Sequence, residues 1–308
     1  MTHAKSTNRI LLGALVLSGL GAVLALGGCK TLVAPLPALA PTQPAAVPDP
    51  SLLARVLDAR VDEGGNVDYA GLKTDAVALE TFYAQIAAVS PDSDPQLFPS
   101  RDEQLAYWIN AYNAAILVSV TRLYPLDSVA DLGPPWYLFF LRDTAGFFYF
   151  RKQVFGGEAF DLYSFENKVI RERFGEARAH FALNCASAGC PRLPREPFRA
   201  ETLDAQLDRE ARRFFAEPRN LTVDHEAGVV WLSQILEWYA EDFTAELGEV
   251  PDGVAPLVEY AARYAPEQLA EELRGRAADY ELRFVPYDWR LNDRDLERYP
   301  VPGAPISG

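Results

Sequence analysis

The sequence predicts an α+β fold, a helix-rich single domain around a small, mainly antiparallel sheet. Apolar residues recur at helical spacing along most of the chain, whereas runs typical of buried strands are few and short. The two patterns do not alternate as βαβ units do, which argues against a doubly wound sheet. Hydrophobic residues make up 49% of the 308 residues and aromatic residues 12%, enough to bury a sizeable core.

The N-terminus predicts an export signal. Lys5 and Arg9 precede an apolar run over 10–26, and small residues lead from there to Cys29. A basic start, a short apolar stretch and small residues before a cut are typical of a secretory signal. The alternative is an uncleaved membrane anchor, for which the run is short because a span takes about 20 residues. We therefore expect residues 1–28 to be a signal peptide.

The motif LGGC, which ends at Cys29, resembles the bacterial lipobox, in which the cysteine after the cut is acylated on its thiol and on its freed amine. Several acyl chains anchor a protein durably in a membrane. Lys30 follows instead of an aspartate, and by resemblance to enterobacterial sorting rules this favours the outer membrane over the inner. We expect a lipid-anchored protein of the bacterial cell envelope that faces the periplasm.

Residues 29–50 are expected to form a tether between the lipid and the domain. Six prolines lie among alanines from Thr31 to Pro50, and proline fixes φ and removes hydrogen-bond donors, which gives an extended, semi-rigid chain. No second low-complexity segment follows. We therefore expect one domain over 51–308, with its folded part ending near Asn292.

Seven helices are expected from apolar spacing, at 50–62, 79–89, 102–123, 164–174, 200–215, 233–243 and 254–264. The clearest is 102–123, in which Leu105, Ile109, Tyr112 and Ile116 form a core-facing stripe. Strands are expected within the aromatic-rich segment 136–150 and at 180–184, 229–232 and 281–285. A loop of small residues, 185–190, follows the second of these.

Two amides stand out on the helix 102–123. Asn110 and Asn113 lie three residues apart, so their side chains are neighbours on the helix surface. They flank the apolar stripe, and a buried amide must find partners or cost free energy. The pair either binds a ligand, together with Tyr112, or satisfies the backbone of a buried loop.

A second group of candidates lies in the segment HFALNCASAGCP, where His180 is in an apolar setting. With Cys29 lipidated, the mature domain keeps Cys185 and Cys190. In an oxidising periplasm these two can reach the Cα separation of roughly 5.5 Å that a disulfide needs. The alternative is a cysteine nucleophile paired with His180, as in papain-like or transglutaminase-like enzymes.

Strand geometry bears on this choice. If 180–184 is extended, His180 and Asn184 share one face and Cys185 lies on the other, so a direct dyad requires the chain to bend. Cys190, carried back by the loop, is no worse placed. The absence of paired spacings such as CxxC or HxxxH argues against a metal site and against a thiol–disulfide exchange role. No metal and no cofactor are expected.

The segment YDWRLN near the end of the domain is expected to be a closing strap with Trp289 as its buried anchor. Its carboxylate, Asp288, could orient His180 as the third member of a triad does. Glu166, on the preceding helix 164–174, is the alternative carboxylate.

These segments together resemble the domain-of-unknown-function 547 family. The residues that carry the resemblance follow one another in the expected order: Gly65–Leu72, Trp108–Ala114, Phe165–Arg171, His180–Pro191 and Tyr287–Asn292. The resemblance implies an envelope protein in bacteria. Plant members of the family carry the domain beside coiled-coil regions and have been discussed as interaction proteins. No activity is established for the family, so the resemblance assigns no catalytic roles.

Two functions remain as hypotheses, and whether the protein is an enzyme stays open. The first is binding of a small molecule or an envelope protein in a polar pocket formed by the helix 102–123 and the His180 segment. Its candidate residues are Asn110, Tyr112, Asn113, Asn184 and Asp288. The second is a cysteine-dependent hydrolase or acyltransferase acting on amide or ester bonds. Its candidate residues are His180, Cys185, Cys190 and Glu166.

Membrane contact is expected through the lipid on Cys29. Nucleic acid is not an expected partner, because a formal net charge of −14 repels polyanions.

Overall fold

The computed structural model describes residues 30–42, 45–133, 145–245 and 247–294. The expected signal peptide and the lipid-bearing Cys29 lie outside the described residues. Most of the aromatic-rich segment 136–150 lies outside them too. In the described part of the chain, none of the helices combines the length and the apolar character needed to cross a bilayer.

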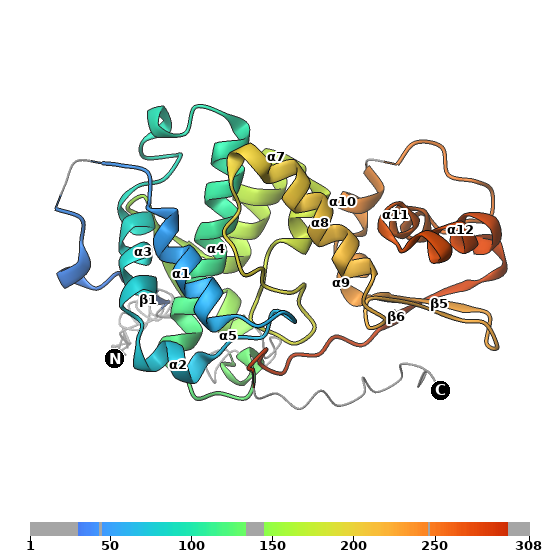
Figure 1. Cartoon of the computed structure of the whole chain (residues 1–308), viewed down its shortest axis with the longest axis horizontal. Coiled ribbons are helices and arrows are strands. Elements are labelled where there is room, and N and C mark those ends of the chain that lie inside the picture. Colours follow the sequence, from blue (N-terminus) through green and yellow to red (C-terminus); the bar gives the residue numbers. More distant parts are fainter. Residues whose placement is uncertain (1–29, 43–44, 134–144, 246, 295–308) are drawn as a thin grey trace, which may run out of the picture.

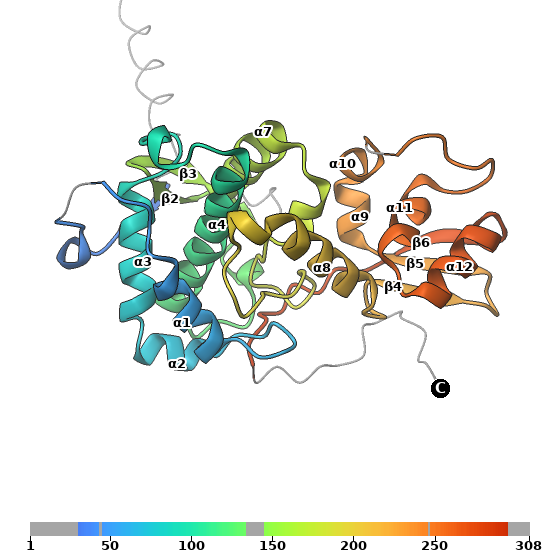
Figure 2. The same cartoon turned by 45° about the horizontal axis from the view of Figure 1, so that its top comes forward.

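The α+β class is confirmed, and the helices and two small sheets form two lobes (Figures 1 and 2). The first lobe surrounds the helix α4 (Arg101–Leu123). Its other helices are α1 (Pro50–Arg60), α2 (Tyr69–Thr74), α3 (Val77–Ala88), α5 (Ala145–Phe148), α6 (Leu162–Ser164) and α7 (Glu172–Phe174). The second lobe contains α9 (Gln234–Trp238), α10 (Ala240–Ala245), α11 (Pro256–Tyr264) and α12 (Glu267–Arg276).

Each lobe has its own hydrophobic core, and two elements belong to both. The helix α8 (Leu203–Phe215) contributes Leu203 to the first core and Phe215 to the second. The segment around His180 does the same, with Ala179 in the first core and Phe181 in the second. The two cores therefore meet along α8 and the His180 segment.

The helix α4 is the centre of the first lobe and confirms the expectation for 102–123. It begins with a capping box, in which the Ser100 hydroxyl accepts from the Glu103 amide at 3.1 Å and the Glu103 carboxylate accepts from the Ser100 amide at 2.7 Å. Every residue from Leu105 to Thr121 is buried. A helix buried on all sides is internal, so both of its asparagines lie inside the protein.

Two three-stranded sheets take the place of the single, mainly antiparallel sheet expected. The first pairs β1 (Thr31–Val33) in parallel with β2 (Arg151–Phe155), which pairs in antiparallel with β3 (Glu158–Asp161). The second pairs β4 (Leu221–Asp224) in antiparallel with β5 (Val229–Ser233), which pairs in parallel with β6 (Glu281–Val285). The expected strands at 229–232 and 281–285 are confirmed as β5 and β6.

The strand β1 changes the expectation of an extended tether over residues 29–50. Residues 31–33 belong to a sheet, so the tether does not begin at the lipid position. Thr31 lies opposite Arg151 in the sheet. The Tyr83 hydroxyl donates to the Val33 carbonyl at 2.6 Å, and Arg122 donates to the Ala34 carbonyl at 2.8 Å. The physical reason is that the prolines begin only at residue 35, so the four residues before them keep the amides that a sheet needs.

The expected helix at 164–174 is confirmed, but it begins earlier and its middle is wider. The Asp161 carboxylate caps it by accepting from the Ser164 amide at 2.9 Å. A π-helical segment, Phe165–Arg171, joins α6 to α7. Such widened turns are found preferentially at functional sites.

The strand expected at 180–184 is wrong. Residues Ala177–Phe181 form a 3₁₀ helix, begun by the Glu176 side chain, which accepts from the Arg178 amide. All residues from Ala179 to Asn184 are buried, so there is no alternation between two faces. A short apolar run of this kind cannot be distinguished from a buried helical segment by its pattern. The strands expected within 136–150 are also wrong where they can be examined, because residues 145–148 form α5.

The chain after β6 returns to the first lobe as an extended segment (Figure 1). It forms isolated bridges from Arg290 to Ser128 and from Leu291 to Ser187. The Leu291 amide donates to the Asp127 carbonyl at 2.7 Å. We call residues 286–294 the strap: they include the segment YDWRLN, for which the sequence predicts a closing strap, and they connect the two lobes.

Candidate functional site

A cavity of about 640 Å³ opens where the two lobes meet. Its lining comes from α4, the π-helical segment, the His180 segment, the loop 185–190, the helix α9 and the strap, together with Lys30, residues 148–150 and Tyr163. Nine of the lining side chains are aromatic. The cavity is therefore lined by segments that lie far apart in the sequence.

The floor of the cavity holds an ionic network around Asp242, which lies on α10 behind the lining side chains. His180 Nε2 is 2.7 Å from Asp242 Oδ2. Arg171 donates to both carboxylate oxygens, from Nε at 2.5 Å and from Nη2 at 2.9 Å. Burial raises the pKa of Asp242, but the hydrogen bonds from His180 and Arg171 outweigh it and hold the pKa well below its usual range. Asp242 therefore stays charged and fixes both side chains.

A second carboxylate, Glu166, faces two phenols. Burial raises the pKa of Tyr112 and of Tyr239, and the negative charge of Glu166 and a hydrogen bond to it raise both further. The two hydroxyls therefore stay protonated. The Tyr239 ring also stacks on the His180 ring at 4.1 Å between centroids and lies 5.0 Å from the Arg171 guanidinium. Tyr239 thus joins the Glu166 and Asp242 groups into one floor.

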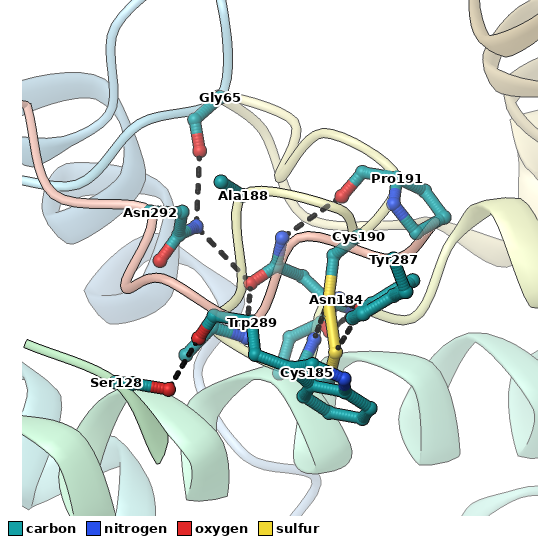
Figure 3. The surroundings of a disulfide bond; sticks show 12 residues. Gly65, Ser128, Asn184, Cys185, Ala188, Cys190, Pro191, Tyr287, Trp289 and Asn292 are labelled. Carbon is teal, nitrogen blue, oxygen red and sulfur yellow. Dashed lines mark hydrogen bonds between the residues drawn. A yellow bond between two sulfur atoms is a disulfide. The ribbon is translucent and has the colours of Figure 1, made fainter. Parts of the chain in front are cut away.

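Cys185 and Cys190 form a disulfide, which confirms the disulfide prediction (Figure 3). Their Cα atoms are 6.1 Å apart, within the range that a disulfide allows. The Tyr287 hydroxyl lies 3.0 Å from the Cys185 sulfur and 3.1 Å from the Cys190 sulfur. Burial raises the pKa of Tyr287. Because both sulfurs are bonded to each other, cysteine catalysis requires that this bond first be reduced.

Aromatic rings form two walls. One wall is a cluster of Trp238, Tyr287 and Trp289, with ring centroids between 4.5 and 5.8 Å apart. The other is the pair Tyr149 and Tyr163, stacked at 4.4 Å. Rings at such distances provide large flat surfaces for an apolar or cationic ligand.

Five of the residues expected from the sequence line this cavity: Tyr112, Glu166, His180, Cys185 and Cys190. The amides of α4 do not. Asn110 bonds to the amide and the carbonyl of Phe198, at 2.9 and 2.8 Å. Asn113 accepts from the Asn184 amide and donates to the Ala182 carbonyl, both at 2.9 Å. Both side chains therefore satisfy the backbone of buried loops, and Asn113 ties α4 to the His180 segment.

Asn184 and Asp288 also lie outside the cavity lining. The Asn184 amide group donates to the Pro191 carbonyl at 2.8 Å and accepts from the Ala186 amide at 2.9 Å, which fixes the loop 185–190 (Figure 3). Asp288 forms an ion pair with Arg290. The carboxylate that contacts His180 is therefore Asp242, not Asp288 or Glu166.

Sequence reasoning missed Asp242, Tyr239, Arg171 and Lys30. Arg171 lies four residues after Asn167 within the motif FENKVIR, and its place in this motif was the signal that could have marked it as a site residue. Asp242 is 62 residues from His180, and its helix shows no spacing that marks one acid among several. Among the described residues, no group of three or more His, Cys, Asp or Glu is arranged to hold a metal ion.

A protein-family model described as "Protein of unknown function, DUF547" matches residues 97–215. This range contains α4, the π-helical segment, the His180 segment, the disulfide and α8, so it covers much of the cavity floor. The resemblance found in the sequence is confirmed over these residues. Neither the curated proteins nor the solved structures contain a match to the chain.

Proposed function

We propose that this chain, which a DUF547 family model matches over residues 97–215, is an envelope lipoprotein whose cavity binds an amphiphilic small molecule. The observation that carries the proposal is the composition of the cavity, in which aromatic walls stand over a polar floor built from Glu166, Arg171 and His180. A mostly apolar cleft with a few polar groups is typical of small-molecule sites, and about 640 Å³ is within their usual range.

The charges of the floor favour a ligand head that donates hydrogen bonds, such as an amine or ammonium group. Arg171 is neutralised by Asp242 through two hydrogen bonds. Glu166 faces two phenols, yet a carboxylate offers about four acceptor positions, so it can accept from a ligand as well. Aromatic faces attract cations. Glu166 is therefore the anchor for the head, and the walls hold the apolar part.

Two observations support the proposed location in the cell envelope. The LGGC motif at Cys29 resembles a lipobox. The disulfide between Cys185 and Cys190 suits an oxidising compartment such as the periplasm. A lipid on Cys29 would then hold the domain at the envelope membrane.

A cysteine-dependent hydrolase is the second candidate. One observation favours it: His180 lines the same cavity as Cys185 and is paired with Asp242 behind it, and such a pair resembles the base and orienting acid of a nucleophilic site. The disulfide holds both sulfurs, so this function depends on a reductant. Binding needs no such step, and we rank it first.

The test compares two soluble amphiphiles that share a chain and differ in head: dodecyltrimethylammonium and dodecyl maltoside. Tryptophan fluorescence of the mature chain, which begins at residue 29 and carries Cys29→Ser, reports binding at concentrations below micelle formation. Glu166→Gln is expected to weaken ammonium binding by about tenfold, or about 1.4 kcal/mol, and to leave maltoside binding nearly unchanged. Glu172→Gln, an exposed acid on α7, is the matched control. Failure of both amphiphiles to bind the wild-type cavity contradicts the proposal.

A further inference from the structure

Lys30 fixes the position of the cavity relative to the expected lipid. It lies directly after Cys29 in the sequence, lines the cavity and forms an ion pair with Asp161 at 3.0 Å. The next residue, Thr31, donates from its amide to the Phe150 carbonyl at 2.8 Å and begins β1. One residue spans at most about 3.6 Å. A lipid on Cys29 therefore leaves almost no free chain between the membrane and this side of the cavity.

Exposed aromatic side chains gather at the same opening. Tyr149, Tyr163 and Trp238 line the cavity and are 40%, 47% and 38% exposed. Tyrosine and tryptophan are the residues that favour the boundary between lipid and water, because each has an apolar ring and a polar atom. This rim therefore has the chemistry of a surface that rests on a bilayer.

The exposure of the lining residues shows which end of the cavity is open to solvent and which end is buried. Tyr112 and His180, on the floor, are 1% and 6% exposed, whereas the aromatic rim is open to solvent. An amphiphile that enters from the rim meets aromatic rings first and Glu166 last. Its polar head must then lead, and its chains remain at the rim.

From this arrangement we propose that the opening of the cavity faces the membrane and that its ligand is an amine-bearing phospholipid of the anchoring leaflet. The headgroup enters first, so that its ammonium reaches Glu166, while the acyl chains lie along Tyr149, Tyr163 and Trp238 and continue into the bilayer. This inference rests on the proposed binding function and on lipid attachment at Cys29. It adds the source of the ligand and its orientation.

The first experiment measures orientation. The lipidated full-length protein is placed in vesicles of phosphatidylethanolamine and phosphatidylglycerol whose acyl chains carry bromine, which quenches nearby tryptophan. We expect quenching that Trp238→Phe reduces and that Trp231→Phe, on β5, leaves in place. An insert of about 15 glycine and serine residues between Cys29 and Lys30 is expected to abolish it, because a flexible chain frees the domain from the surface. The same insert between Asp252 and Gly253, in an exposed turn, is the control. Quenching that survives the first insert, or that Trp238→Phe does not reduce, overturns the inference.

The second experiment measures the ligand. The wild-type protein, taken from an equal mixture of the two phospholipids, is expected to retain phosphatidylethanolamine over phosphatidylglycerol. Glu166→Gln is expected to lower that preference by about fivefold or more. Equal retention of both lipids by the wild-type protein overturns the inference. Binding of soluble dodecyltrimethylammonium distinguishes failure of this inference from failure of the proposed function. If the ammonium compound binds but the lipid preference is absent, only this inference is wrong. If the ammonium compound does not bind either, the proposed function is wrong as well.

Discussion

At the scale of single residues, Asp242 determines the charge balance of the cavity floor. It accepts from His180 and twice from Arg171, and its side chain is 26% exposed. Charged hydrogen bonds of this kind are stronger than neutral ones. Without the carboxylate, the Arg171 guanidinium beside Tyr239 loses its ion-pair partner and keeps its hydrogen bond to the Asn167 side chain, and the His180 ring loses the contact that orients it. Asp242 is therefore a positioning residue for the whole floor.

The first prediction follows from the lowered pKa of Asp242. The ordinary pKa of an aspartate, about 3.9, applies to the unfolded chain. Because the folded-state pKa is lower, the folded protein binds fewer protons in this window and stability rises with pH. The contribution is complete above about pH 5 and is lost as the pH falls through the folded-state pKa. Asp242→Asn should lower the free energy of unfolding at pH 7 by about 1–2 kcal/mol. It should also flatten the loss of stability between about pH 5 and pH 3.

Urea unfolding followed by circular dichroism at several pH values measures this effect. Asp252→Asn, in an exposed turn of the same lobe, is the control and should leave the pH dependence as in the wild type. If the free energy of unfolding depends on pH in the same way for Asp242→Asn and the wild type, the ionisation of this carboxylate contributes nothing to stability.

At the scale of elements, the loop 185–190 is held by more than its disulfide. The Ala188 amide donates to the Arg290 carbonyl at 2.7 Å, and the Gly189 amide donates to the Asp288 carbonyl at 2.8 Å. Asn184 bonds to both ends of the loop, through Ala186 and Pro191. These bonds join the loop to the strap. The loop should therefore keep its shape when the sulfurs are removed.

The second prediction concerns the disulfide. Its two cysteines are five positions apart, and closing so short a loop contributes only about 2 kcal/mol through the entropy of the unfolded chain. The double variant Cys185→Ala with Cys190→Ala should fold and lose about that much in urea unfolding. Thiol labelling of the wild type should detect both cysteines only after reduction. One fast-reacting thiol without reductant, whose reactivity disappears in His180→Ala, would instead support the cysteine-dependent hydrolase.

Helices and sites differ in how far the sequence predicts them. The helix α4 was predictable because its apolar pattern is local. The strand expected at 180–184 failed because Phe181 and Leu183 pack into different cores and only the tertiary structure decides their conformation. Five lining residues were predictable because their motifs are distinctive. Asp242 was not, because its pairing with His180 joins separate segments.

At the scale of the whole molecule, the question is whether the two lobes form one folding unit. Phe181 lies at their junction and is 1% exposed. Its ring centroid is 4.6 Å from that of Phe214 on α8 and 5.4 Å from that of Phe243 on α10. Its neighbours Ala179 and Ala182 pack into the first core. A contact shared in this way couples the two cores.

The third prediction is that unfolding is cooperative over both lobes. Phe181→Ala should lower the free energy of unfolding by roughly 3–5 kcal/mol, because it opens a space in a packed aromatic cluster. Tryptophan fluorescence and far-UV circular dichroism should still give coincident transitions, as one cooperative unit requires. Leu273→Ala, a buried position of α12 away from the junction, is the control and should also move both signals together. If either variant separates the two transitions, the lobes are independent domains. The cavity between them would then depend on docking rather than on a shared core.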